Sequence, residues 1–349
     1  MSDPRALPVG TVPVPEHRAA DLREVRERLL GAKRVVLTTH LNADGDGAGS
    51  EAAVAAWLAE QGVASVIVNP TRFPLQFRFL LDPSTRVADW GGMEAVQAID
   101  NADLLLVLDT SEPERIGPLA SVLPRERMLV VDHHPPGSKT VADVGLLDPT
   151  AAAVGELVYD LLSLDGDPPP QASLLGIYVA LVTDTGSFRY SNTTARTHAI
   201  ASDLLARGID PEAVYQRLFA TVPRRRIELL REVLGTLQTE RESGLAWMVV
   251  SHALISRVGA SGEDLDNLIE HARSLEGTEV ALLFRETPEG HTKISFRSNG
   301  AADVNRLARE FGGGGHVKAA GALIPARPAE AAPRVLAVAR AIIAGGLRR

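Results

Sequence analysis

The chain has 349 residues, of which 45% are hydrophobic and 23% are charged, and its formal net charge is −8. This length suits two domains, and the composition is typical of a soluble globular protein. The absence of cysteine excludes disulfides, thiolate zinc sites and cysteine nucleophiles. The negative charge argues against a broad basic surface for long nucleic acid, so an anionic substrate should be small.

Membrane and export signals are also absent from the sequence. No stretch reaches the roughly 18–20 apolar residues that a membrane span needs. The first residues contain prolines but no apolar segment typical of a secretory signal. We therefore expect a cytoplasmic protein with no membrane partner, beginning with a flexible arm at residues 1–18.

The first half of the chain alternates between strand and helix patterns. An Ala-rich segment at 51–60 predicts a helix, and 174–182 is ambiguous, with helix favoured because the run follows Pro168–Pro170. Short, nearly continuous apolar runs are typical of strands buried on both faces of a parallel sheet, and they lie at 34–39, 63–68, 104–109 and 128–132. The alternation predicts an α/β domain over residues 19–200.

The second half of the chain predicts a connector and a smaller domain. The pattern over 201–239 is helical and indicates a linker. The remaining residues, 240–349, combine strand and helix patterns and predict an α+β domain. The expected strands are 245–251, 279–286 and 292–298, and the expected helices are 304–311 and 328–343.

The first group of residues that could carry chemistry follows the first predicted strand. His40, Asp44 and Asp46 lie within seven residues, and the glycines between and after them allow a tight loop. One imidazole and two carboxylates suit a hard divalent cation. The alternatives are an acidic solvated loop or a dinucleotide-binding turn. Two carboxylates would repel the pyrophosphate in such a turn, so the metal site is favoured.

Three more polar positions end apolar runs of the same domain. Asp109, the triplet Asp132-His133-His134, and Asp184 each have a simpler explanation when taken singly, as a turn former, a helix cap or a surface histidine. Together they should converge on one edge of the sheet, where clustered carboxylates need a cation. Two ions, about 3.5–4 Å apart, are suggested because one ion needs fewer ligands than the six candidates, which are His40, Asp44, Asp46, Asp109, His133 and Asp184. Without sulfur ligands, manganese or magnesium is favoured over zinc.

The order of these motifs resembles that of a known family. The segments HLNADGDGAGS, LDTSE, VDHH and VTDTG are similar to the motifs of the DHH phosphoesterases, and the resemblance runs from about residue 20 through nearly the whole chain. It implies a parallel-sheet α/β domain joined by a helical linker to a smaller α+β DHH-associated domain, with the active-site cleft between them.

The resemblance also implies roles for the individual residues. One metal would be held by His40, Asp44 and Asp109, and the other by Asp46, Asp109, His133 and Asp184, so that Asp109 bridges the two ions. His134 would face the substrate phosphate, and Asp132 would support the histidines. The implied catalytic residues are thus His134, Asp109 and Asp132.

A second candidate site lies near the C-terminus, where four glycines precede His316. Consecutive glycines let a phosphate approach the backbone closely, although a floppy loop is the alternative. The segments FGGGGHVKAAG and SFRSN resemble the substrate-binding motif of the DHH-associated domain. Arg189, in SFRYSNTT, is a further candidate for the substrate site. The residues implied by the resemblance are Arg297, Ser298, Asn299, Gly313, Gly314, Gly315 and His316.

Within the family, the two-domain plan resembles the NrnA-type enzymes. This resemblance implies a manganese-dependent nanoRNase that hydrolyses short single-stranded RNA or DNA oligonucleotides, with phosphatase activity on 3′-phosphoadenosine 5′-phosphate. Magnesium is the alternative metal, and cyclic di-AMP or pApA the alternative substrate. A nucleotide sensor without turnover is the alternative from another class. The resemblance also allows a homodimer.

Overall fold

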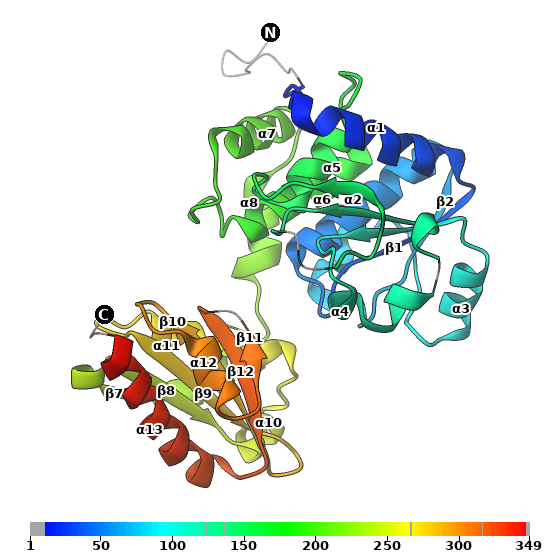
Figure 1. Cartoon of the computed structure of the whole chain (residues 1–349). Coiled ribbons are helices and arrows are strands. Elements are labelled where there is room, and N and C mark those ends of the chain that lie inside the picture. Colours follow the sequence, from blue (N-terminus) through cyan, green and yellow to red (C-terminus); the bar gives the residue numbers. More distant parts are fainter. Residues whose placement is uncertain are drawn as a thin grey trace. The chain divides into compact units, whose positions relative to one another are not determined.

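The computed structural model describes residues 11–122, 124–135, 137, 139–265, 267–315 and 317–346. The chain divides into two compact units, Met1–Ala220 and Thr221–Arg349. Figure 1 shows the chain coloured along the sequence. None of the helices within the described ranges is both long and apolar enough to cross a membrane.

The first unit is built on a parallel sheet with the strand order β3-β2-β1-β4-β5-β6. Chain order reverses direction between β1 and β4, and in open α/β sheets ligands bind where such strands end. The strands are β1 (Arg34–Thr38), β2 (Ala64–Ile67), β3 (Arg86–Val87), β4 (Leu104–Leu108), β5 (Met128–Asp132) and β6 (Val144–Leu147). The predicted parallel α/β fold is confirmed.

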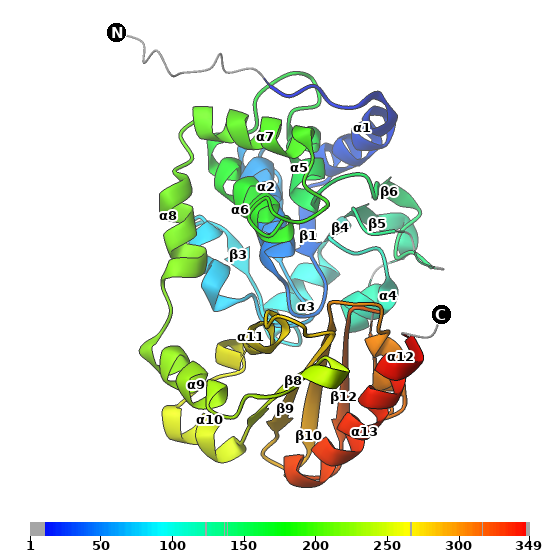
Figure 2. The ribbon, with the colours of Figure 1, turned by 90° about the vertical axis from the view of Figure 1, so that its left-hand side faces the viewer.

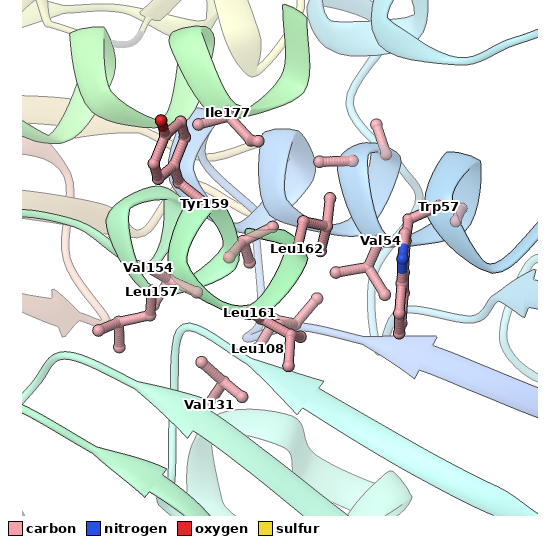
Figure 3. Packing of buried hydrophobic residues seen from close by; sticks show 14 of the residues in the cluster. Val54, Trp57, Leu108, Val131, Val154, Leu157, Tyr159, Leu161, Leu162 and Ile177 are labelled. Carbon is pink, nitrogen blue, oxygen red and sulfur yellow. The ribbon is translucent and has the colours of Figure 1, made fainter. Parts of the chain in front are cut away.

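Helices cover both faces of this sheet because its strands are apolar on both sides. Leu37 and Leu108 belong to the core that includes α1, α2, α5 and α6, whereas Val36 and Val107 pack with α3 and α4. Figure 3 shows Leu108 and Val131 of the sheet beneath side chains of α5. The helices are α1 (Glu16–Gly31), α2 (Gly45–Glu60), α3 (Met93–Asp100), α4 (Pro113–Ile116), α5 (Val154–Leu162), α6 (Leu174–Asp184), α7 (Ala195–Ala206) and α8 (Pro211–Tyr215).

Two segments of this unit differ from what the sequence patterns predict. Helix α2 begins at Gly45, whereas the pattern predicts a helix only from residue 51, so the glycine-rich segment is its first turn and not a loop. A Cβ on Gly49 would lie 2.5 Å from the carbonyl oxygen of Gly176, so glycine is required there by the close approach of α2 and α6. Near the N-terminus, α1 begins at Glu16, inside the segment expected to be a flexible arm.

The second unit contains a mixed sheet with the order β11-β12-β10-β9-β8-β7, in which only the β8–β9 pair is parallel among the described strands. Helices α12 and α13 pack on one face, and α9, α10 and α11 on the other (Figure 2). The strands are β7 (Gln238–Glu240), β8 (Leu245–Val250), β9 (Val280–Glu286), β10 (Thr292–Ser298), β11 (Gly314–Gly315) and β12 (Ala319–Ile324). The helices are α9 (Arg224–Leu234), α10 (His252–Val258), α11 (Leu268–Arg273), α12 (Val304–Arg309) and α13 (Pro328–Gly346).

Candidate metal centre

The segment between β1 and α2 places the first three predicted ligands. Asp44 is the N-cap of α2, and its Oδ1 accepts hydrogen bonds from the backbone N–H groups of Asp46 (3.0 Å) and Gly47 (3.1 Å). Asp46 is 1% exposed and accepts the N–H groups of Val154 (2.7 Å) and Gly155 (2.9 Å). These two donors form the N-terminus of α5, which favours a negative charge.

His40 is oriented by its own backbone neighbour. Its Nδ1 donates to the carbonyl oxygen of Leu41 at 2.9 Å, which leaves Nε2 as the nitrogen facing the carboxylates. Nε2 lies 3.3 Å from Oδ2 of Asp109 and 3.7 Å from Oδ2 of Asp44. A hydrogen bond from the far ring nitrogen to a backbone carbonyl is the arrangement that fixes a metal-binding histidine.

Asp109 occupies the end of β4, next to β1 in the sheet. Its backbone has φ +63°, in the left-handed region that a non-glycine residue rarely adopts, and its N–H donates to the carbonyl oxygen of Val131 at 3.0 Å. This conformation turns a carboxylate that is 2% exposed back over the ends of the strands. Strained backbone of this kind concentrates at functional sites.

His133 brings the end of β5 to the same place. Its Nδ1 donates to the carbonyl oxygen of Ala151 at 3.3 Å. Its Nε2 lies 3.6 Å from Oδ1 of Asp109, 3.7 Å from Oδ2 of Asp184 and 3.9 Å from Oδ2 of Asp46. Asp184 ends α6, as the favoured helical interpretation of 174–182 predicts, so this carboxylate comes from a helix end and not a strand end.

All six predicted ligands therefore lie together in the first unit. Groups of three side chains offer ligand atoms within 4.8 Å of one another, a spacing that a bound cation can bridge. One of these groups has the same members as the first predicted ligand set, and another contains three of the four members of the second, all but Asp109. The groups are His40, Asp44 and Asp109; Asp46, His133 and Asp184; and Asp109, His133 and His134.

The electrostatics of the cluster fit a cation. Burial and the neighbouring carboxylates raise the pKa of Asp46 well above its usual range, and burial raises that of Asp184 to about 6. Among the described atoms, Nε2 of His40, Nε2 of His133 and Oδ1 of Asp109 are buried without a hydrogen-bond partner. Buried polar atoms are normally paired, so these unpaired atoms are suited to divalent metal ions.

His134 has a different environment from His133. Its Nδ1 donates to Oδ1 of Asp132 at 2.8 Å, and this hydrogen bond raises the pKa of the imidazole. Its ring is partly exposed, and Nε2 lies 3.5 Å from Nη1 of Arg115. Asp132 therefore orients the imidazole of His134.

Arg115 and Asn192 were not recognised from the sequence. No carboxylate of the described residues pairs with Arg115, although it is half-buried in α4 beside His134. Asn192 donates to Oδ2 of Asp184 at 3.1 Å and to the carbonyl oxygen of Ala152 at 2.9 Å. Arg115 lies six residues after Asp109, so proximity to that motif was the available signal, whereas nothing in the sequence marks Asn192.

The predicted substrate-binding residues of the second unit have mixed environments. Arg297 is half-buried in β10, and its Nε lies 3.5 Å from Oε1 of Glu270. The side-chain amide of Asn299 donates to the carbonyl oxygens of Arg273 and Thr278, so it connects the end of β10 to the segment that runs from the end of α11 to β9. Ser298 is 4% exposed.

The glycine segment forms the short edge strand β11 and pairs with β12. A Cβ on Gly313 would lie 2.1 Å from the carbonyl oxygen of Gly321, and Gly315 has φ +145°, so both glycines have a steric reason. Gly314 is exposed, and a Cβ there would make only an ordinary contact, 3.9 Å from Oδ1 of Asn305. His316 lies outside the described residues.

Arg189 lies in the first unit, after α6. Its Nε donates to the carbonyl oxygen of Gly186 at 2.6 Å, and its side chain is exposed. The turn that carries it includes Ser187 and Phe188, both with positive φ. None of the described contacts links Arg189 to the cluster of candidate ligands, so its predicted role in substrate binding rests on its position in the sequence.

Comparison with known proteins identifies the family. A model described as the N-terminal domain of the DHH family matches residues 34–181, and a model of the DHHA1 domain matches residues 249–345. A bifunctional oligoribonuclease and PAP phosphatase NrnA from Thermus thermophilus is 30% identical over 292 residues, covering 83% of this chain and 84% of the relative. The chain belongs to the DHH family. The resemblance seen in the motifs is thus confirmed, as is the prediction of a hydrolase acting on phosphate esters.

Another curated relative and two solved structures also align with most of this chain. The NrnA of Bacillus subtilis is 26% identical and covers 83% of this chain and 89% of its own length. Among solved structures, an exopolyphosphatase-related protein from Bacteroides fragilis is 25% identical, with a TM-score of 0.83 over 92% of this chain and 96% of that chain. An exonuclease RecJ bound to manganese has a TM-score of 0.51 at 17% identity, over 97% of this chain and 96% of that chain. At this identity the likeness is one of fold.

Proposed function

We propose that this chain is a nanoRNase that hydrolyses very short oligonucleotides to mononucleotides and removes a phosphate from 3′-phosphoadenosine 5′-phosphate. The observation that carries the proposal is the convergence of six histidine and aspartate side chains where β1 and β4 end. The relatives from Thermus thermophilus and Bacillus subtilis, which align over most of this chain, bear the name oligoribonuclease and PAP phosphatase.

We further propose that the six side chains hold two divalent cations. His40, Asp44 and Asp109 would bind one ion, and Asp46, Asp109, His133 and Asp184 the other. When bound, such a pair neutralises phosphate charge and lowers the pKa of a coordinated water. Manganese is our expectation, with magnesium as the alternative, because the ligands are oxygen and imidazole nitrogen.

Beside the cluster, His134 and Arg115 form a site suited to a phosphate. Asp132 accepts the Nδ1 proton of His134 and raises the pKa of this imidazole, which favours the doubly protonated form. In that form Nε2 carries a proton that it can donate to a phosphate oxygen or to the leaving oxygen. The guanidinium of Arg115, 3.5 Å from Nε2, adds donors that match a phosphate. We propose that these two residues orient the scissile phosphate.

The second unit would hold the far end of the substrate. This role rests on the predicted residues Arg297 and Gly314, and on a match to the DHHA1 domain. Gly314 has no steric reason to be glycine, which is consistent with close approach of a ligand to the backbone. The catalytic domain at 19–200, the linker at 201–239 and the substrate-binding domain at 240–349 stay our proposed division. The arm expected at 1–18 must be shorter, because α1 begins at Glu16 and Arg18 is buried. The cytoplasmic location and the homodimer also stay predictions.

Product analysis tests this function. The purified chain with Mn²⁺ should convert pApA to mononucleotides and 3′-phosphoadenosine 5′-phosphate to AMP, and EDTA should abolish both reactions. Asp109→Asn is the matched inactive control. Binding of these nucleotides without turnover would instead identify a sensor and contradict the proposal.

Cyclic di-AMP is the second substrate to be tested. A cyclic-di-AMP phosphodiesterase GdpP from Geobacillus thermodenitrificans is 24% identical over 85% of this chain, but this chain covers only 46% of that protein. Faster hydrolysis of cyclic di-AMP than of pApA would move the assignment to that branch of the family.

A further inference from the structure

The segment between β6 and α5, residues 148–153, contacts the metal centre at several points. The carbonyl oxygen of Ala151 accepts from His133 at 3.3 Å. The carbonyl oxygen of Ala152 accepts from Asn192, which also donates to Asp184. Directly after the segment, the N–H groups of Val154 and Gly155 hold Asp46. Three candidate ligands from three different elements are therefore oriented through this one segment, called here the 148–153 loop.

The two ends of the 148–153 loop are fixed by carboxylates. Oδ1 of Asp148 accepts from the N–H and hydroxyl groups of Thr150, at 2.9 and 2.6 Å. At the other end, Oε2 of Glu156 accepts from the N–H of Ala152 at 3.3 Å. The position of the loop consequently depends on what holds the side chains of Asp148 and Glu156.

Both carboxylates are held by Arg18, on α1. Its Nε lies 2.5 Å from Oδ2 of Asp148, and its Nη1 lies 2.8 Å from both Oε1 of Glu156 and Oδ2 of Asp160. Arg18 is 2% exposed, and each of the three acids is at most 5% exposed. Charged groups buried in this way interact strongly, because solvent does not screen them.

The planar guanidinium is required for this arrangement. Its Nε and Nη1 point to the two ends of the 148–153 loop at the same time, which the single ammonium of a lysine cannot do. Arg196 adds a second positive charge against Glu156 and Asp160 but has no described contact with Asp148. Arg18 alone among the described residues thus connects both ends of the loop.

We propose that Arg18 is a positioning residue of the metal centre, which sets the ligand geometry of His133, Asp46 and Asp184 through the 148–153 loop. The inference rests on the proposed metal centre and goes beyond it. Arg18 lies outside residues 34–181, the part of the chain that matches the DHH model, and it contacts none of the ligands directly. Partners that orient metal ligands typically change metal affinity by about 10- to 100-fold when replaced.

A pair of isosteric variants tests this role. Asp148→Asn and Asp160→Asn each remove one carboxylate charge from Arg18, but only Asp148 anchors the 148–153 loop. Mn²⁺ affinity should be measured by electron paramagnetic resonance on the folded fraction, without substrate. We expect Asp148→Asn to weaken binding by about 10-fold or more, whereas Asp160→Asn should stay close to the parent chain.

Arg18→Lys provides a second measurement. It keeps the positive charge but loses the separate Nε and Nη1 donors that contact Asp148 and Glu156. Arg18→Lys should also weaken Mn²⁺ binding. If this variant does not fold, the comparison of Asp148→Asn with Asp160→Asn decides the question alone. Parent-like affinity in Asp148→Asn, or an equal loss in Asp160→Asn, would show that the network is only structural. A parent chain that binds no Mn²⁺ would overturn the proposed metal centre itself, and this inference with it.

Discussion

Nε2 of His40 and Oδ2 of Asp109 lie 3.3 Å apart, at the ends of the two strands between which the sheet order reverses. Burial alone would lower the pKa of His40, but Asp109 and Asp44 raise it to about 10. In the absence of a metal, a proton on His40 therefore offsets the neighbouring carboxylates. A divalent cation would take the place of this proton.

The first prediction is that metal binding releases protons. A metal ligand must be deprotonated, and His40 without metal keeps its proton until the pH approaches about 10. The apparent affinity for Mn²⁺ should therefore rise with pH between about 6 and 9. Calorimetric titrations in buffers of different ionisation enthalpy measure both the affinity and the number of protons released.

The control for this experiment is Asp109→Asn, which is nearly isosteric and removes the charge of the proposed bridging ligand. It should weaken Mn²⁺ binding and also lower the proton release, because the pKa of His40 loses one of its main supports. An affinity for Mn²⁺ that does not change between pH 6 and pH 9 would contradict the prediction.

The second prediction concerns Arg115. Its replacement by alanine removes a charged donor beside His134, and such hydrogen bonds are worth about 1.5–3 kcal/mol. The kcat/KM for pApA should fall by about 10- to 100-fold, while Mn²⁺ affinity stays unchanged because Arg115 belongs to none of the ligand groups. Arg72→Ala, an exposed arginine paired with Asp89, is the control and should keep full activity. A loss of metal affinity in Arg115→Ala would place the residue in a different role.

Much of the catalytic unit could be predicted because its signals are local. Strands buried on both faces read as continuous apolar runs, so β1, β4 and β5 were found, and the residues that follow them had to meet at one edge. The sequence contains less information on the edge strands. β3 has only two residues, and β6, with the sequence VGLL, contains a glycine and is mostly half-buried, so neither shows a recognisable pattern.

The parts of the site that escaped prediction depend on contacts between distant residues. Asp46 is held by Val154 and Gly155, more than 100 residues away, and no periodicity encodes that pairing. The glycines of α2 were explained by a tight loop, whereas Gly49 is needed because α6 packs against it. Local conformational preference and tertiary packing favour the same residue there, so only the structure separates the two causes.

The third prediction separates two neighbouring glycines. Gly314→Ala would make only an ordinary contact at 3.9 Å and should fold normally, whereas a Cβ on Gly313 would lie 2.1 Å from a backbone oxygen of β12. Gly313→Ala should therefore be less stable by about 1–3 kcal/mol, measured by urea unfolding. If a ligand approaches this backbone, Gly314→Ala should raise KM for pApA and leave kcat and stability largely unchanged. Unchanged KM in a stable Gly314→Ala would argue against a substrate contact at that position.

The fourth prediction concerns the pH dependence of stability. Burial raises the pKa of Asp160 to about 6, against the lowering effect of Arg196 and Arg18. Between about pH 4 and pH 6 the native state therefore keeps a proton on Asp160 that the unfolded state has lost, and this group's contribution to stability decreases as the pH rises. Asp160→Asn cannot titrate. Its stability relative to the parent chain should increase by about 1–3 kcal/mol across this range and level off above it.

Asp148→Asn is the control of opposite sign. The pKa of Asp148 is lowered, since the hydrogen bonds from Thr150, His17 and Arg18 outweigh its burial, so its favourable contribution is complete above its unfolded-state pKa and is lost only on further acidification. Asp148→Asn should therefore be less stable than the parent by an amount that stays constant from pH 5 to pH 7. Urea unfolding at intervals of one pH unit measures both differences. Parallel stability curves for Asp160→Asn and the parent chain would show that Asp160 is already ionised at pH 4, and that the two arginines overcome the effect of its burial.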